Sequence, residues 1–239
     1  MIAKRAIRRM ETKHLPRFVL IPSPFVGAVS WHATAAALPD AIACDYGGVS
    51  APDWYDGMAR RIVAQCDARP WIAVLHSGAG GFAPAIASAA AHLAGVIFVD
   101  AILPYPGKSY SETAPADFIA QLRRVTIDGN LPPWNKWFEA DPLPRLFPDS
   151  AAREAFARDL PRVPFAFLEA VSPDASGWEN LPAAYVQLSN AYDMEAQDAE
   201  RRGWIVRRAR LHHLAMASEP EKIAELLSGL PFYFFSFRS

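Results

Sequence analysis

The sequence predicts an α/β fold built on a six-stranded, mostly parallel sheet with helices on both faces. Two observations indicate this fold. Short apolar runs alternate with segments of helical spacing, and one apolar run leads directly into a glycine-rich turn and an alanine-rich segment. Parallel strands covered on both faces are near-continuous apolar runs, so the pattern favours a buried parallel sheet. The 239 residues suffice for one domain with a substantial core, or for a domain with a large insertion.

Six apolar runs are expected to form the strands, and five intervening segments to form helices. The predicted strands are residues 17–21, 41–44, 71–75, 95–99, 184–188 and 204–206. The predicted helices are 31–38, 54–66, a segment from the glycine-rich turn to about Leu93, 195–202, and a last helix that begins at Pro220. Proline suits the first turn of a helix, because the amide hydrogen that it lacks would have no partner there.

A long segment, residues 103–181, interrupts the alternation and is rich in proline. It contains two short stretches of helical spacing, 115–124 and 151–160. We therefore expect a core formed by 1–102 and 182–239, with a helical cap, 103–181, inserted after the fourth strand. Three aromatic residues of this cap, Trp134, Trp137 and Phe138, are expected to contact a small, apolar substrate. They could equally form the interior of the cap itself.

The strongest chemical pattern follows the run 71–75, where the chain reads His76-Ser77-Gly78-Ala79-Gly80. A serine between small residues on a sharp strand-to-helix turn is typical of a nucleophile elbow. Ser77 is therefore the predicted nucleophile, and the Gly78 N–H, at a helix start, the predicted oxyanion donor. Leu75 stands where the pattern G-x-S-x-G has glycine, so we expect a strained or tilted turn. The alternative is that Ser77 merely caps the helix.

The predicted base is a histidine in the loop before the last helix. In this arrangement the usual pattern is Gly-His, a few apolar residues, and then a proline seven positions after the histidine. His213 lies seven residues before Pro220, whereas His212 lies eight before it and takes the glycine position. This spacing favours His213 over His212, although both could be surface-loop histidines. A metal site would need further ligands at suitable spacing, and the sequence offers none.

A carboxylate is expected to orient the histidine and to stabilise its protonated form. Asp193 is the favoured acid, because it follows the strand 184–188 after a short loop. Asp100 is the second candidate, because it directly follows the strand 95–99. Glu195 and Asp198 are weaker candidates. A Ser-His dyad, or a histidine held by water, is the remaining alternative.

The loop after the first strand is expected to complete the oxyanion hole. This loop usually reads His-Gly-x, and here Pro22-Ser23 takes the place of His-Gly. Pro24 then falls on the donor position, and proline has no amide hydrogen. The second donor is therefore the Phe25 N–H, or the hole is incomplete.

The chain resembles a family of short bacterial α/β-hydrolases. The matching stretches are 22–27, 76–80, 99–104, 129–134, 202–204 and 213–220, which together span nearly the whole chain. In such relatives glycine usually stands where this chain has Leu75 and His212. The resemblance implies an α/β-hydrolase fold and hydrolysis of an ester, thioester, lactone or amide through an acyl-enzyme. It implies no particular substrate.

Composition argues against several other classes of function. The net charge of −1 argues against a broad nucleic-acid surface. No apolar run approaches the roughly 18–20 residues that span a bilayer. Cys44 and Cys66 have no metal or redox spacing, so a reduced cytoplasmic compartment and no cofactor are expected. The aromatic run Pro231 to Phe237 could pack on the domain or on a second subunit in a homodimer.

Two other functions remain open on the same fold. One is a small-molecule-binding protein without hydrolytic activity, which Leu75 and Pro24 favour. The other is a lyase or cyclase that uses the same residues for proton transfer.

Overall fold

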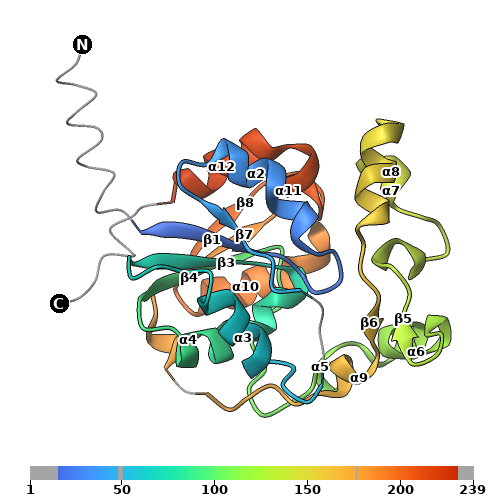
Figure 1. Cartoon of the computed structure of the whole chain (residues 1–239), viewed down its shortest axis with the longest axis horizontal. Coiled ribbons are helices and arrows are strands. Elements are labelled where there is room, and N and C mark those ends of the chain that lie inside the picture. The colour runs from blue at the N-terminus through green and yellow to red at the C-terminus, as the bar shows by residue number, and fades with distance from the viewer. Residues whose placement is uncertain (1–15, 48–50, 176, 231–239) are drawn as a thin grey trace.

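The computed structural model describes residues 16–47, 51–175 and 177–230, and its centre is one six-stranded parallel sheet (Figure 1). The strand order is β2-β1-β3-β4-β7-β8. The strands are β1 (Arg17–Ile21), β2 (Ile42–Ala43), β3 (Trp71–His76), β4 (Leu93–Val99), β7 (Ala183–Gln187) and β8 (Ile205–Arg208). Every neighbouring pair in this sheet is parallel, so the carboxyl ends of all six strands lie along one edge.

Two helical layers cover the faces of the sheet (Figure 1). One contains α2 (His32–Ala37), α11 (Ala215–Ser218) and α12 (Pro220–Ser228), and the other contains α3 (Asp56–Val63), α4 (Ala83–Ala89) and α10 (Asp193–Arg201). Strands β3 and β4 are buried along their whole length. Their side chains point alternately into the two apolar layers, as a strand with helices on both faces requires.

The segment between β4 and β7 lies at the carboxyl edge of the sheet (Figure 1). It holds the short strands β5 (Asn130–Leu131) and β6 (Val163–Pro164), which pair antiparallel. Its helices are α5 (Tyr110–Thr113), α6 (Ala116–Val125), α7 (Leu143–Leu146), α8 (Ser150–Arg158) and α9 (Ala166–Glu169). The division into a core and a cap stays a prediction, but this segment supplies much of the wall around the site described below.

The predicted fold class is confirmed, and the sheet is parallel throughout. The helix after β3 differs from the sequence-based expectation, and the segment 103–181 holds three short helices beyond the two expected. The chain after β3 first forms a 3₁₀ turn, Ser77–Phe82, and α4 then ends at Ala89 rather than near Leu93. Leu93 instead begins β4 and pairs with Trp71, because the sheet gives its backbone a ladder partner. The aromatic run after Leu230 lies outside the described residues.

The described part of the chain contains no helix with the length and apolar character needed to cross a lipid bilayer.

Candidate active site

Ser77 lies at the end of β3 on a sharp turn into the 3₁₀ segment. Its φ is 55°, in the left-handed region that few residues other than glycine adopt. Such strain persists only where the surroundings hold it, and it is often found at functional residues. Leu75 does not prevent the turn, because it is fully buried in β3 and pairs with Ile21 and Phe98 on either side.

Glycines let the turn approach its neighbours closely. A side chain at Gly80 would begin 1.8 Å from the carbonyl oxygen of Ile102, in the chain that follows β4. The Ile102 N–H donates to the Ser77 carbonyl oxygen at 3.2 Å, which fastens the two strand ends together. A side chain at Gly78 would meet the Phe25 ring at 2.9 Å. The small residues around Ser77 are therefore required by these close contacts.

The Asp100 carboxylate is fully buried at the end of β4 and accepts four hydrogen bonds. Oδ1 accepts from the backbone N–H groups of Leu188 and Ser189, at 2.8 and 2.9 Å. Oδ2 accepts from the Ser189 hydroxyl at 2.6 Å and lies 2.8 Å from His213 Nδ1. Burial alone would raise the pKa of Asp100, but the hydrogen bonds from His213 and Ser189 outweigh it and lower the pKa. The carboxylate is thus held ionised beside the imidazole.

Asp193, the favoured acid in the sequence, occupies a different environment. It is exposed at the first position of α10, and its carboxylate accepts a hydrogen bond from the Gln187 side chain. Gln187 in turn accepts from Arg208 Nε at 2.9 Å. Among the described residues the hydrogen-bond partner of His213 Nδ1 is Asp100. The structure therefore brings His213 to the second of the two aspartates; neither Glu195 nor Asp198 bonds to its ring.

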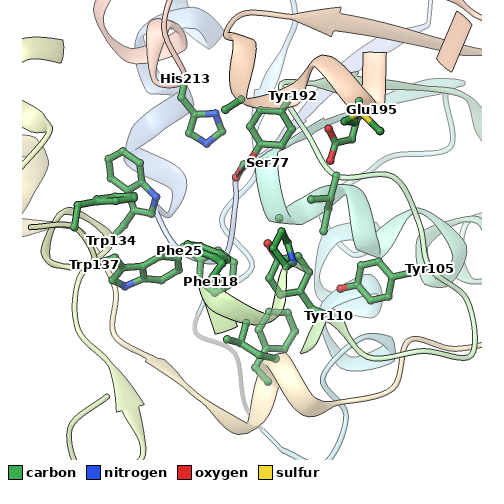
Figure 2. Close-up of a pocket in the computed structure, with 18 residues that line it drawn as sticks. Phe25, Ser77, Tyr105, Tyr110, Phe118, Trp134, Trp137, Tyr192, Glu195 and His213 are labelled. Carbon is green, nitrogen blue, oxygen red and sulfur yellow. Dashed lines mark hydrogen bonds between the residues drawn. The ribbon is translucent and has the colours of Figure 1, made fainter. Parts of the chain in front are cut away.

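The two adjacent histidines point to different neighbours. The His213 ring backs onto Asp100 and borders the same cavity as Ser77 (Figure 2). The His212 ring lies 2.9 Å from the Ser218 hydroxyl through Nε2, and its Nδ1 accepts from the Leu214 N–H at 3.3 Å. Of the two, His213 has the surroundings that a base next to Ser77 needs.

His76, the residue before Ser77, supports the loop that carries His213. Its ring is fully buried, and Nε2 lies 3.0 Å from the His213 carbonyl oxygen. The two imidazole rings are 4.6 Å apart. Burial, together with the nearby His213, lowers the pKa of His76 well below its ordinary value. A neutral His76 can donate from Nε2, and this hydrogen bond fixes the backbone from which the His213 ring projects.

Tyr192 contacts both Ser77 and His213, although no pattern in the sequence indicates a role for it. Its phenol oxygen lies 3.3 Å from Ser77 Oγ, and its ring stacks on His213 with centroids 5.2 Å apart and planes 12° apart (Figure 2). Burial raises the pKa of the phenol, so it stays protonated at neutral pH. The position of the loop 188–193, after a strand and at the carboxyl edge of the sheet, could have indicated that its residues lie near the site. A single tyrosine in such a loop forms no recognisable sequence motif.

The loop after β1 packs against the turn that carries Ser77 and Gly78. The Phe25 ring packs at Gly78, so the two predicted oxyanion donors belong to contacting residues. The Phe25 N–H donates to the Ser23 hydroxyl over a long distance of 3.4 Å. Ser23 therefore partly occupies this donor, and Pro24 offers none.

A cavity of about 460 Å³ opens in front of Ser77 and His213. Half of the residues that line it are Phe, Tyr or Trp, and they include Trp134, Trp137 and Phe138, the three residues expected from the sequence. Figure 2 shows Trp134 and Trp137 at this cavity. Trp137 is buried and donates from Nε1 to the Pro132 carbonyl oxygen at 2.8 Å, whereas Phe138 is exposed. The aromatic residues thus border a cavity and also pack against the segment that carries them.

Within the described ranges, no group of three or more His, Cys, Asp or Glu side chains is arranged to hold a metal ion.

The fold and this arrangement at its carboxyl edge define an α/β-hydrolase. The sequence matches the alpha/beta hydrolase family over residues 18–226, and the chain belongs to that family.

Solved structures with the same fold include several hydrolases and related enzymes. An extracellular α/β-hydrolase from a Paenibacillus species, described as sharing structural and functional homology with tobacco salicylic acid binding protein 2, is 21% identical. The match covers 89% of this chain and 97% of that one, with a TM-score of 0.70. Tomato methylketone synthase I, solved as a variant with β-ketoheptanoate, is 15% identical. The match covers 92% of this chain and 98% of that one, with a TM-score of 0.69.

A pyrethroid hydrolase from Sphingobium faniae JZ-2 is 16% identical over 89% of this chain and 96% of that one, with a TM-score of 0.64. At these identities the likeness shows the fold alone. No curated protein matches the sequence.

Proposed function

We propose that the protein is a serine hydrolase that cleaves an ester, thioester, lactone or amide of a small, largely apolar molecule through an acyl-enzyme. The observation that carries this proposal is the juxtaposition of a strained Ser77 and a His213 backed by Asp100 at one cavity. A serine hydroxyl is a weak nucleophile unless a base takes its proton, and a base works best when a third group orients it.

In the proposed reaction, Ser77 Oγ attacks the carbonyl carbon while His213 Nε2 takes the hydroxyl proton. Asp100 holds the Nδ1–H tautomer and stabilises the imidazolium that forms. The Gly78 N–H, with the Phe25 N–H when it leaves Ser23, donates to the oxyanion. The same imidazolium protonates the leaving group, and water then hydrolyses the acyl-enzyme with His213 again as the base.

In the proposed reaction, Tyr192 positions Ser77 and His213. When its phenol donates to Ser77 Oγ, the serine hydrogen is free to point to His213. The tyrosine ring also covers one face of the imidazole and limits its rotation. The aromatic lining of the cavity supports an apolar substrate, because such side chains bury apolar area without leaving polar groups unpaired.

The test is hydrolysis of p-nitrophenyl butyrate by the native protein and by Ser77→Ala. We expect kcat/KM to fall by about 10³-fold or more in the variant, because removing the nucleophile leaves only binding and oxyanion stabilisation. Ser88→Ala, at an exposed position in α4, is the matched control and should keep native activity. Equal activity of native protein and Ser77→Ala would contradict the proposal.

One observation favours a second function, proton transfer without an acyl-enzyme. The hydrogen bond that the described structure gives the Ser77 hydroxyl is with Tyr192, and a hydroxyl so held can act as a donor to a bound carbonyl. In Ser77→Ala a lyase or cyclase of this kind would lose one hydrogen bond to the carbonyl, about tenfold in kcat/KM, whereas a hydrolase would lose its nucleophile and about 10³-fold or more. The size of the loss therefore separates the two functions.

A further inference from the structure

The cavity in front of Ser77 has two chemically different walls. The side formed by Trp134, Trp137 and Phe118 offers aromatic surface (Figure 2). Across the cavity lie Tyr110 and Glu195, which bring a hydroxyl and a carboxyl group (Figure 2). Ser77 and His213 lie between the two sides, so a substrate bound at Ser77 would extend toward both.

Glu195 is the acidic residue in the lining of this cavity, and none of the described residues forms an ion pair with it. None of the described residues that line the cavity is a lysine or an arginine. Within the described chain, the carboxylate has no side-chain hydrogen-bond partner and interacts with its own backbone N–H. Burial raises the pKa of Glu195, and the negative charges of Asp100 and Asp198 raise it further. A ligand that brings a positive charge would relieve this unfavourable environment.

Tyr110 is the neighbour through which such a ligand would be recognised. Its hydroxyl has no hydrogen-bond partner among the described residues, although the ring borders the cavity. Burial, and then the nearby Glu195 carboxylate, raise the pKa of Tyr110 to about 12. The phenol therefore remains neutral, and its ring belongs to the lining of the cavity, where an aromatic ring attracts a cation.

From this arrangement we propose that Glu195 and Tyr110 form a subsite for an alkylated ammonium group of the substrate, with the apolar part of the molecule on the tryptophan side. The inference rests on the proposed hydrolase function and names its substrate class, an ester or thioester that carries a cation. An alkylated ammonium group is favoured over a hydroxyl, because it satisfies both the unpaired carboxylate and the aromatic faces beside it.

The test compares two thioesters of the same shape. One is butyrylthiocholine, and the other is its neutral isostere, in which a tert-butyl group replaces the trimethylammonium group. Released thiol reports hydrolysis of both. We expect the native protein to prefer the cationic thioester by about tenfold in kcat/KM, and the ratio of the two kcat/KM values to fall to about one in Glu195→Gln. Glu221→Gln, at an exposed position outside the cavity, is the control. Equal rates for both thioesters, or an unchanged preference in Glu195→Gln, would overturn the subsite.

A binding measurement separates this inference from the hydrolase proposal. Choline is titrated calorimetrically into Ser77→Ala and into Ser77→Ala/Glu195→Gln, after thermal melts have shown that both variants are folded. Binding that is lost with Glu195 supports the subsite even if neither thioester is hydrolysed. Absence of choline binding to Ser77→Ala overturns the subsite, whereas the hydrolase proposal then stands or falls on ester hydrolysis alone.

Discussion

The chain after β4 and the chain after β7 each place an aspartate at the carboxyl edge of the sheet, in opposite environments. Asp100 is fully buried, has a φ of 43°, and accepts four hydrogen bonds. Asp193 is exposed at the start of a helix and bonds to Gln187. The strand that ends in the buried aspartate is the direct neighbour of the strand that carries Ser77.

This contrast shows that the chain after β4 and the chain after β7 contribute different groups to the same hydrogen-bond network. The β4 end supplies the carboxylate, while the β7 end supplies groups that hold it: the Leu188 and Ser189 backbone N–H groups and the Ser189 hydroxyl. The same β7 loop supplies Tyr192, which contacts Ser77. A charge buried without such donors would be costly, so the loop after β7 is needed for an acid after β4 to work.

The largest expected effect distinguishes the two aspartates directly. Asp100→Asn should lower kcat/KM for p-nitrophenyl butyrate by about 10³- to 10⁴-fold, because the amide no longer stabilises the imidazolium or selects its tautomer. Asp193→Asn should stay within about threefold of the native protein. Steady-state kinetics on both variants provide the measurement. A large loss in Asp193→Asn with little loss in Asp100→Asn would reverse the assignment.

Ser189→Ala tests whether the β7 loop supports the β4 carboxylate. The variant removes a 2.6 Å hydrogen bond to a buried charge, so the free energy of unfolding should fall by about 2 kcal/mol. Urea unfolding provides the measurement, and Ser88→Ala, exposed in α4, should be close to native. Equal stability of the two variants would mean that the Ser189 hydroxyl contributes nothing to holding Asp100.

The pH dependence of stability tests the environment of Asp100. The pKa of Asp100 is lowered in the folded protein, mainly through His213 and Ser189 against the opposing effect of burial. The unfolded chain therefore takes up this proton first as the pH falls. The contribution is present above about pH 4 and is lost as the pH falls toward the folded pKa. Below about pH 4, Asp100→Asn should flatten the fall in unfolding free energy by up to about 1.4 kcal/mol per pH unit. A fall as steep in Asp100→Asn as in the native protein would contradict this account.

The smallest expected effect concerns Tyr192. Tyr192→Phe keeps the ring on His213 but loses the hydroxyl near Ser77 Oγ. A single hydrogen bond of about 1 kcal/mol corresponds to about a fivefold loss, which should appear in kcat rather than in KM. A Tyr192→Leu variant should lose more, because the stacked ring is gone as well. If kcat is unchanged in both variants, Tyr192 does not position Ser77.

The sequence predicted those parts of the fold and site that depend on local pattern. Near-continuous apolar runs indicated the parallel sheet, the small residues after β3 indicated the turn at Ser77, and the distance to Pro220 favoured His213 over His212. Each of these is a property of one short stretch, where backbone geometry and residue size limit what can fit.

The choice between Asp100 and Asp193 could not be made in the same way. Both follow apolar strands, and the difference arises from contacts between distant parts of the chain, such as Leu188 and Ser189 donating to Asp100. The role of Tyr192 depends on where the β7 loop lies over Ser77. The end of α4 also depends on distant contacts. The alanine-rich pattern predicts a helix to about Leu93, but α4 ends at Ala89 because Leu93 pairs with Trp71 in the sheet.

The most direct test of the central claim, that Ser77 is a nucleophile activated by His213 and Asp100, is covalent labelling with a fluorophosphonate probe followed by mass spectrometry of the peptides. We expect one adduct on Ser77 in the native protein, none in Ser77→Ala, slower labelling in Asp100→Asn and native labelling in Asp193→Asn. Absence of an adduct on Ser77 in the native protein, under conditions in which a known serine hydrolase is labelled, would contradict the claim.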